Sequence, residues 1–286
     1  MLSDINYIIP SYKRADILCK TTLKLLDREG VEVVSLYINR RELNDYKTEI
    51  ESHNFNLLVV YNAVDFDGIG RLRNHIRNSY PTGSNLLMID DDIEEILIKE
   101  GDTLVPLQNI HEFNIKMFEK AEENDIYYWG VQLHTNPYFM KNKYQFGLSY
   151  INGSWTGHRI NHALKKIETN IDHFEDYLFS ILHFIRDRNV LKASQVALKT
   201  KCFNAQGGIC SQKNGFLKRR EEACLNGYRI KSHFDELLYL TKSKKFDVQN
   251  IRFKNVKWHK NLIENWNNYE NYNKLHQEYF KPISTN

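Results

Sequence analysis

The chain has 286 residues, of which 42% are hydrophobic, and a formal net charge of +3. This apolar content excludes a wholly disordered protein, and so small a positive excess does not by itself indicate nucleic-acid binding. The sequence contains no CxxC pair, no basic start before an apolar run and no apolar run of about 20 residues, which disfavours zinc-finger, secreted and membrane-spanning classes. We expect a cytoplasmic protein with reduced thiols and no membrane partner.

Strand and helix patterns alternate through the first ninety residues. The predicted elements are a strand at 6–9, a helix at 20–28, a strand at 31–38, a helix at 43–53, a strand at 57–61, a helix at 70–79 and a strand at 86–89. This order predicts an α/β fold with a mostly parallel sheet and right-handed crossovers, flanked by helices.

The remainder of the chain has a less regular pattern. It predicts a helix at 111–124, strands at 127–133 and 144–152, an apolar helix at 175–188 and one or two helices after 258. Because no repeat or linker interrupts the chain, a single domain over 1–286 is the simplest prediction.

Three consecutive carboxylates, Asp90, Asp91 and Asp92, follow the strand at 86–89. The carboxyl edge of a parallel sheet is where open α/β folds bind ligands. In an extended segment Asp90 and Asp92 face the same side, and two hard oxygen ligands suit Mg²⁺ or Mn²⁺. The alternatives are a loop that happens to be acidic, or capping of a following helix by Asp91 and Asp92.

Two further loops are candidates for nucleotide and phosphate binding. Pro10, Ser11, Tyr12, Lys13 and Arg14 follow the first strand, where an aromatic ring can stack on a base and a cation can pair with phosphate, although Ser11 can equally cap a helix.

The second loop, at 67–74, contains Gly68 and Gly70, which allow close approach to a ligand, and then Arg71 and Arg73. These two arginines cannot share one helix face, so at most one points at the site.

Later in the chain, Glu175 and Asp176 open the apolar helix. They either interact favourably with the helix N-terminus as capping charges, or one of them serves as a general base for an acceptor hydroxyl. His259 is a candidate third metal ligand. Loops at 152–157 and 205–209 could close over a substrate, and Trp155 is either a stacking platform or a core anchor.

Lysines and arginines are frequent between Lys192 and Lys260. They form either a solvated face or a surface for a polyanionic acceptor.

Taken together, the loops at 10–14, 68–74, 90–92 and 175–176, with a late histidine, resemble the GT-A glycosyltransferases. The first three loops also look like the TET-associated glycosyltransferases of phages, which are thought to glycosylate hydroxymethylated bases in viral DNA. The resemblance implies a GT-A fold, with a nucleotide-sugar-binding half at about 1–125 and an acceptor-binding half at about 126–286.

The resemblance also implies roles for individual residues. Asp92, with Asp90 and His259, would hold Mn²⁺ or Mg²⁺, and Asp176 or Glu175 would deprotonate the acceptor. A UDP-sugar donor would contact a set comprising Pro10, Ser11, Tyr12, Arg14, Gly70, Arg71, Arg73, Asp90 and Asp91. Trp155, Gly207 and Gly208 would contact the acceptor.

The implied reaction is transfer of a hexose or pentose to a hydroxymethylated pyrimidine in double-stranded DNA, in the host cytoplasm if the enzyme is phage-encoded. Three alternatives remain open at this point: a glycan- or polysaccharide-building transferase, a nucleotidyltransferase, and an inactive nucleotide-sugar- or DNA-binding protein. The nucleotidyltransferase is disfavoured because the loop at 10–14 lacks glycine. The sugar, the stereochemistry and the oligomeric state are left open.

Overall fold

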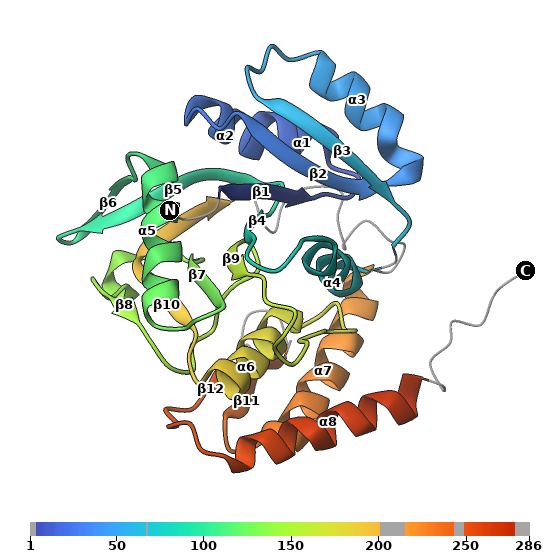
Figure 1. The fold of residues 1–286 in the computed structure, drawn as a ribbon, viewed down its shortest axis with the longest axis vertical. Helices are drawn as coiled ribbons and strands as arrows, with labels where there is room; N and C mark the ends of the chain where they lie inside the picture. Colours follow the sequence, from blue (N-terminus) through green and yellow to red (C-terminus); the bar gives the residue numbers. More distant parts are fainter. Residues whose placement is uncertain (1–3, 67, 201–214, 243–248, 278–286) are drawn as a thin grey trace, which may run out of the picture.

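The computed structural model describes residues 4–66, 68–200, 215–242 and 249–277 (Figure 1). Its framework is a ten-stranded sheet in the order β3-β2-β1-β4-β9-β7-β10-β5-β6, and β8 pairs with β10. The first half of this sheet is parallel and consists of β1 (Ile5–Pro10), β2 (Val33–Asn39), β3 (Leu58–Val64) and β4 (Asn85–Ile89). These four strands confirm the predicted βα alternation.

The second half of the sheet is mixed. It contains β5 (Ile93–Glu100), β6 (Thr103–Pro106), β7 (Tyr128–Gln132), β8 (Tyr144–Gln145), β9 (Trp155–Arg159) and β10 (Leu191–Thr200). Of the strands in this described sheet, β5, β8 and β9 run against the other seven, so the sheet is mostly parallel as predicted. The strand predicted over 144–152 is wrong in extent, because pairing ends at Gln145.

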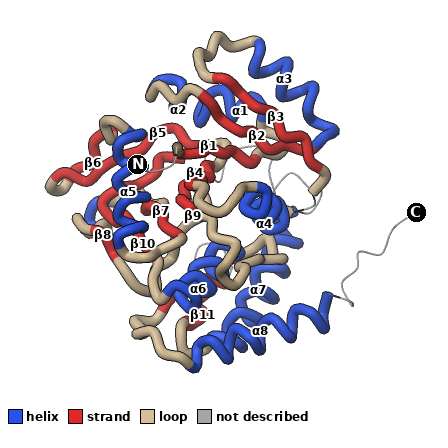
Figure 2. Tube along the Cα trace, viewed as in Figure 1, coloured by secondary structure: helices blue, strands red, loops and turns tan. Residues whose placement is uncertain are grey.

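Helices flank the sheet on both sides (Figure 2). The first helical segment is continuous and comprises α1 (Ala15–Leu18), the π-helical turn η1 (Cys19–Leu23) and α2 (Lys24–Arg28). The others are α3 (Leu43–Glu51), α4 (Ile69–Ser79), α5 (Ile110–Glu123), α6 (Glu175–Asp187), α7 (Gly215–Phe234) and α8 (Asn261–Gln277), with short 3₁₀ turns at Arg40–Glu42 and Pro137–Phe139. A separate hairpin joins β11 (Leu238–Lys242) to β12 (Gln249–Phe253).

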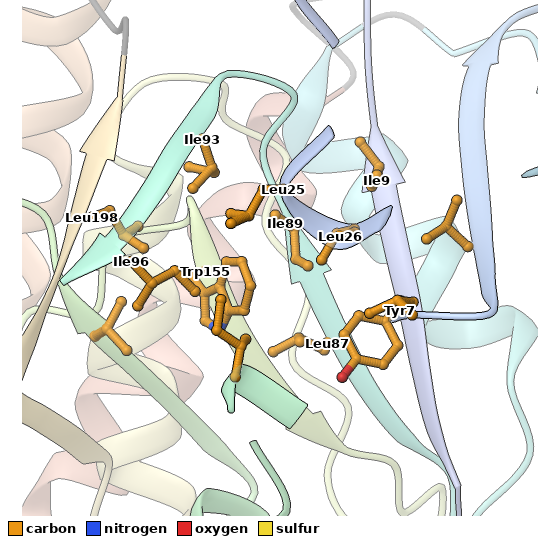
Figure 3. Close-up of a cluster of buried hydrophobic side chains, with 14 of the residues drawn as sticks. Tyr7, Ile9, Leu25, Leu26, Leu87, Ile89, Ile93, Ile96, Trp155 and Leu198 are labelled. Carbon is orange, nitrogen blue, oxygen red and sulfur yellow. The ribbon is translucent and has the colours of Figure 1, made fainter. Parts of the chain in front are cut away.

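The apolar side chains form two large clusters. The first lies between the central strands and the helices α1, α2, α3 and α5, and includes Leu87, Ile89 and Trp155 (Figure 3). The second joins α6, α7, α8 and the β11–β12 hairpin, which Figure 1 shows at the end of the molecule opposite α3. Among the described residues, no helix combines the length and apolar character required to cross a bilayer.

The parallel pairing of β1 with β4 positions the candidate site. Ile8 lies opposite Met88 in the register, so the loop after Pro10 and the carboxylates after Ile89 emerge at the same edge of the sheet. Sequence segments eighty residues apart therefore meet at the carboxyl ends of two adjacent strands, which is the expected ligand edge of such a sheet.

Candidate active site

The three aspartates form a turn between β4 and β5. Asp91 and Asp92 are turn residues. The prediction that Asp90 and Asp92 face the same side assumed an extended segment, which the structure does not have here. The turn is held by the π turn η1, where the hydroxyls of Thr21 and Thr22 donate to the carbonyls of Asp91 (2.9 Å) and Asp90 (2.8 Å).

The loop after β1 binds the middle of this turn. The Ser11 hydroxyl donates to Asp91 Oδ2 at 2.5 Å and also contacts the Tyr46 hydroxyl at 2.6 Å. One nitrogen of Arg14 pairs with Asp91 at 3.1 Å and with Asp92 at 3.4 Å. Ser11 and Arg14 thus lie at the predicted place, but they contact the aspartates of the protein itself.

Arg73 joins two of the predicted motifs. Its guanidinium pairs with Asp90 at 2.9 Å, donates to the Gly153 carbonyl at 3.0 Å and forms an ion pair with Glu175 at the first residue of α6. A Cβ atom at Gly153 would overlap the guanidinium, so a larger residue there would force Arg73 to move. A single cation therefore connects α4, the aspartate turn and α6.

Asp176 lies beside this ion pair with hydrogen bonds of its own. The Tyr150 hydroxyl donates to Asp176 Oδ2 at 2.6 Å, and the Tyr177 amide donates to Oδ1 at 2.8 Å. The Asn152 side-chain amide donates to the Tyr150 hydroxyl at 2.9 Å, and the rings of Tyr150 and Tyr177 stack at 3.9 Å. This arrangement fixes the orientation of the Asp176 carboxylate.

Burial raises the pKa of several carboxyl groups of the site. It raises the pKa of Asp91 to about 6, against the lowering effect of Arg14, and that of Asp92 to about 7, with the charges of Asp90 and Asp91 adding to the shift. Glu175 and Asp176 are an adjacent buried pair, and the pKa of each is raised, mainly by burial. Such a concentration of perturbed carboxyls is typical of functional sites.

A small cavity of about 10 Å³, with room for roughly one water molecule, adjoins Glu175 and Asp176. Its lining includes Arg73, Arg77, Tyr128, His158 and Phe179. Arg77 lies over the Phe179 ring at 3.9 Å and donates to Asn74 at 2.6 Å, and burial lowers its pKa to about 9. The cavity is far too small for a nucleotide sugar, whereas the Asp90 side chain outside it is 31% exposed.

The aspartate turn fits a divalent cation in its chemistry. Asp92 Oδ1 is buried and has no hydrogen-bond partner among the described residues, although its other oxygen contacts Arg14. A buried carboxylate oxygen without a partner is costly, and a hard cation would satisfy it. Asp92 and the partly exposed Asp90 are the residues that would hold such an ion.

The prediction for His259 as a metal ligand is wrong. His259 pairs with Glu236 at 3.0 Å. Its neighbour Trp258 donates to the carbonyl of Ile185, near the last turn of α6. Glu175 lies ten residues earlier on the same helix, about 15 Å away. The histidine is therefore at the far end of α6 from the aspartates.

The expected phosphate contact at Gly70 is also corrected. The Gly70 amide donates to the Asp172 carboxylate at 3.1 Å, and a Cβ atom at Gly70 would lie 2.5 Å from the Ile171 carbonyl. The glycine therefore permits close packing against the 169–172 segment, whose own carboxylate occupies the start of α4. Arg71 is exposed, which confirms that only one of the two arginines, Arg73, points at the aspartates.

The remaining donor candidates differ in access. Pro10 is buried at the end of β1, whereas Tyr12 is 38% exposed and carries the Lys13 ammonium 5.1 Å from its ring centre. Tyr12 is thus free to stack on a planar ligand, and its contact with a nucleotide stays a prediction.

For Trp155 the structure selects the core alternative. The side chain is fully buried in the first apolar cluster (Figure 3), and its indole donates to Asn114 at 3.2 Å. It cannot stack on an acceptor, so that prediction is wrong. The other acceptor candidates, Gly207 and Gly208, lie outside the described residues.

The basic stretch after Lys192 is only partly described. Lys192 itself is buried on β10, where burial lowers its pKa to about 8, so it does not belong to a surface for polyanions. Lys199 is exposed and pairs with Glu94 at 3.3 Å. Much of the remaining positive charge lies at 201–220 and 243–248, where side chains are outside the described residues.

Several residues of the site were not predicted from the sequence. Tyr150 and Asn152 orient Asp176, Arg77 lines the cavity, and Thr21 and Thr22 hold the aspartate turn. The only sequence signal was that Asn152 begins the predicted loop at 152–157 and that Tyr150 lies close to it. Hydroxyls inside an apolar helix carry no such signal, because they usually bond within the helix.

No protein-family model and no curated protein matches this chain. Among solved structures it is similar to TarS of S. aureus (residues 1–349), with 14% identity and a TM-score of 0.43 over 68% of this chain and 59% of that one. A mannosyltransferase of Pyrobaculum calidifontis, solved with GDP-Man and Mn²⁺, has 12% identity and a TM-score of 0.48 over 70% of this chain and 58% of that one.

A 4-diphosphocytidyl-2C-methyl-D-erythritol synthase of Anaerococcus prevotii has 12% identity and a TM-score of 0.39 over 75% of this chain and 94% of that one. The chain therefore spans about three-fifths of the length of the first two proteins. Likenesses this distant describe partial overlap of the fold and assign no activity.

Proposed function

We propose that this chain is a GT-A type glycosyltransferase that moves a sugar from a UDP-sugar to a hydroxymethylated pyrimidine in DNA. The observation that carries the enzymatic part is the bridge made by Arg73 between Asp90 and Glu175. Three motifs that the sequence presents far apart meet there, at the ligand edge of the sheet. Buried carboxyls with raised pKa values beside that bridge are the groups that acid–base chemistry requires.

The proposed chemistry assigns distinct roles to the two carboxylates of α6. Asp176, oriented by Tyr150, would accept the proton of the acceptor hydroxyl while the new bond forms between that oxygen and the anomeric carbon. The bond from the anomeric carbon to the diphosphate oxygen breaks, and its electron pair leaves with UDP. Glu175, paired with Arg73, would position the α6 end of the site relative to Asp90.

Asp90 and Asp92 would hold Mn²⁺ or Mg²⁺, which when bound neutralises negative charge on the departing diphosphate. The partnerless oxygen of Asp92 supports this assignment. Arg14 already lies against Asp91 and Asp92, and would limit the repulsion between this cluster and an anionic donor.

The DNA acceptor rests on the resemblance of the loops at 10–14, 68–74 and 89–93 to the phage enzymes and on the positive charge between 192 and 260. Phosphate contacts by lysine and arginine would give an affinity that falls steeply with salt.

The decisive experiment supplies labelled UDP-sugars to the protein with hydroxymethylated duplex, unmodified duplex, an oligosaccharide panel or no acceptor. Label transfer only to the hydroxymethylated duplex, with binding that weakens as salt rises, supports the whole proposal. Transfer to oligosaccharides alone refutes the DNA acceptor and leaves a glycan-building transferase. Donor binding without any turnover identifies an inactive binding protein.

A matched pair of variants tests the base in the same assay. Asp176→Asn keeps the shape and one acceptor for Tyr150 but removes the basic oxygen, so kcat should fall about 10²- to 10⁴-fold. Asp45→Asn at an exposed position of α3 is the matched control and should leave kcat unchanged. Full activity of the Asp176 variant would exclude it as the base.

A further inference from the structure

A cysteine, a glutamate and a histidine meet on the side of the first helical segment that faces α3. Cys19 Sγ, a carboxylate oxygen of Glu49 and a ring nitrogen of His53 all lie within 4.8 Å of one another. In the part of the chain that the structure describes, this is the one group of three or more such side chains close enough to share a metal ion. We propose that these three residues form a site for a zinc-type divalent cation, with a fourth position open to water.

The geometry is close to what such an ion needs. Bonds of about 2.0 to 2.3 Å place the ligands of a tetrahedral ion roughly 3.3 to 3.8 Å apart. Glu49 and His53 are separated by four residues at the end of α3, and their nearest atoms are already 3.5 Å apart. The thiol of Cys19 lies within 4.8 Å of both of these atoms, so a small side-chain adjustment would complete the set.

The chemistry of the three groups favours zinc over the cations expected at the aspartate turn. A thiolate and a carboxylate together carry the charge that balances a divalent ion, and imidazole completes a sulfur–nitrogen–oxygen set. Thiolate selects soft or borderline metals, whereas Mg²⁺ and Mn²⁺ prefer oxygen ligands. The two sites would therefore take different metals from the same solution.

The site is accessible from one side. Cys19 is 1% exposed, but the side chains of Glu49 and His53 are each 34% exposed, so an ion would enter between them and meet the thiol behind. Burial, followed by the Glu49 charge, raises the pKa of Cys19 to about 12. An incoming ion would displace the proton of this thiol.

The position of Cys19 connects this site to the aspartate turn. Cys19 begins the π turn whose next residues include Thr21 and Thr22, and their hydroxyls hold the carbonyls of Asp91 and Asp90. π turns inside α-helices are frequent at functional positions. A cation at Cys19 would tie this turn to α3 and stabilise the half of the sheet that contains β1, β2 and β3, independently of any glycosyl transfer.

Cobalt is a suitable probe because a thiolate–Co²⁺ bond gives a near-ultraviolet charge-transfer band that carboxylate sites lack. Titration of the full chain with Co²⁺ should produce this band with one ion per chain, and Zn²⁺ should remove it whereas excess Mg²⁺ should not. Cys19→Ser should abolish the band, and Glu49→Gln or His53→Asn should weaken Co²⁺ binding at least 10-fold. Cys224→Ser, a partly exposed cysteine elsewhere, is the matched control and should retain the band.

A thermal unfolding measurement shows whether the variants are folded. Zn²⁺ should raise the Tm of the wild-type protein and of Cys224→Ser, but not that of Cys19→Ser, whose Tm without metal should be near that of the wild type. A charge-transfer band that survives in Cys19→Ser, or its absence in the wild-type protein at millimolar Co²⁺, would overturn the proposal.

Discussion

The guanidinium of Arg73 pairs with two carboxylates of the candidate site. It neutralises Asp90 and Glu175 together, and both carboxylates come from segments that would otherwise repel each other. Removing one partner of a buried ion pair is strongly destabilising, because the remaining charge stays buried without compensation. The Glu175 carboxyl, whose pKa burial already raises, would then become protonated.

We therefore expect Arg73→Gln to lower the free energy of unfolding by about 3 kcal/mol and to reduce kcat/KM about 100-fold. Chemical denaturation and steady-state kinetics would measure the two effects. Arg71→Gln, on the exposed side of the same helix, is the control for helix propensity and net charge and should keep the stability of the wild type. Equal stability of the two variants would mean that the Arg73 bridge contributes nothing.

The buried side chain of His183 should make the stability of the protein depend on pH. It lies buried on α6 and bonds Asp187 at 2.6 Å, and burial lowers its pKa to about 4, although Asp187 opposes the shift. The unfolded chain, with an ordinary histidine pKa of about 6.5, binds the proton more readily. Above pH 6.5 His183 is neutral in both states and does not lower the free energy of unfolding. As the pH falls from 6.5 towards 4, the free energy of unfolding decreases by about 1.4 kcal/mol per pH unit.

Denaturant unfolding at pH 7.5 and at pH 5 should show a loss of about 2 kcal/mol at the lower pH from this group alone. His183→Asn, which does not titrate, isolates the effect from that of the buried carboxyls. The difference in stability between the variant and the wild type should shrink by this amount at pH 5. A constant difference at both pH values would contradict the buried neutral histidine.

At the scale of elements, the π turn η1 determines the shape of the aspartate turn. The Thr22 hydroxyl donates to the Asp90 carbonyl and accepts from the Ile93 amide, both at distances of 2.8 to 2.9 Å. A regular helix would direct such a hydroxyl to its own preceding carbonyl, and the single Thr21 hydroxyl lies within hydrogen-bond distance of both the Ile17 carbonyl (2.5 Å) and the Asp91 carbonyl (2.9 Å). The π turn instead frees Thr22 for the neighbouring loop.

Thr22→Val keeps the shape of the side chain and removes both of these hydrogen bonds. Because a buried amide and a buried carbonyl lose their partners, the free energy of unfolding should fall by about 2 kcal/mol, and the affinity for the donor should fall with it. Isothermal calorimetry and denaturation would measure the two quantities. Thr48→Val, at an exposed position of α3, should change neither.

Strands in the second half of the sheet show where periodicity fails. β9 contains Thr156 and His158, polar residues that are nonetheless buried, and these two side chains contact each other at 3.0 Å. β10 is buried at nearly every position but includes Lys192, Ser194 and Gln195. Such strands do not show the apolar pattern that predicts a strand, because polar residues occupy several of their buried positions.

For the whole molecule, the order of the sheet determines which loops share an edge. β1 lies between β2 and β4, and the antiparallel β9 separates β4 from β7. The donor half of the proposed site therefore lies beside the parallel strands, whereas Glu175 and Asp176 come from α6, within the second apolar cluster. Arg73 joins these two regions by pairing with Asp90 on one side and Glu175 on the other.

A ligand that binds only the folded protein must raise the stability of the whole molecule. At a concentration about 100 times its Kd, a donor should contribute about 2.7 kcal/mol. A thermal-shift panel of nucleotide sugars should thus show a rise in Tm for a UDP-sugar with Mn²⁺ and a smaller rise without the metal. Asp92→Ala should abolish the difference due to Mn²⁺, and a metal-independent shift would contradict a metal held by the aspartates.

The sequence by itself determined the parallel first half of the sheet, the position of Asp90–Asp92 after β4 and the helices α3 to α6. These predictions depended on local signals, namely apolar periodicity, glycine and proline positions and charge at helix starts, which short segments carry by themselves. Parallel strands with intervening helices also restrict the topology strongly, so the predicted order of elements already placed the loops after β1 and β4 at the same edge of the sheet.

The tertiary structure alone decided the partners of each side chain. It placed His259 with Glu236, buried Trp155 in the core, turned Arg73 towards Asp90 and Glu175, and brought Cys19 to His53. The residues in each of these contacts are at least 17 positions apart in the sequence, the smallest separation being that of Arg73 and Asp90. Side-chain partners across such distances depend on how helices and strands pack together, and no local pattern of residues encodes that packing.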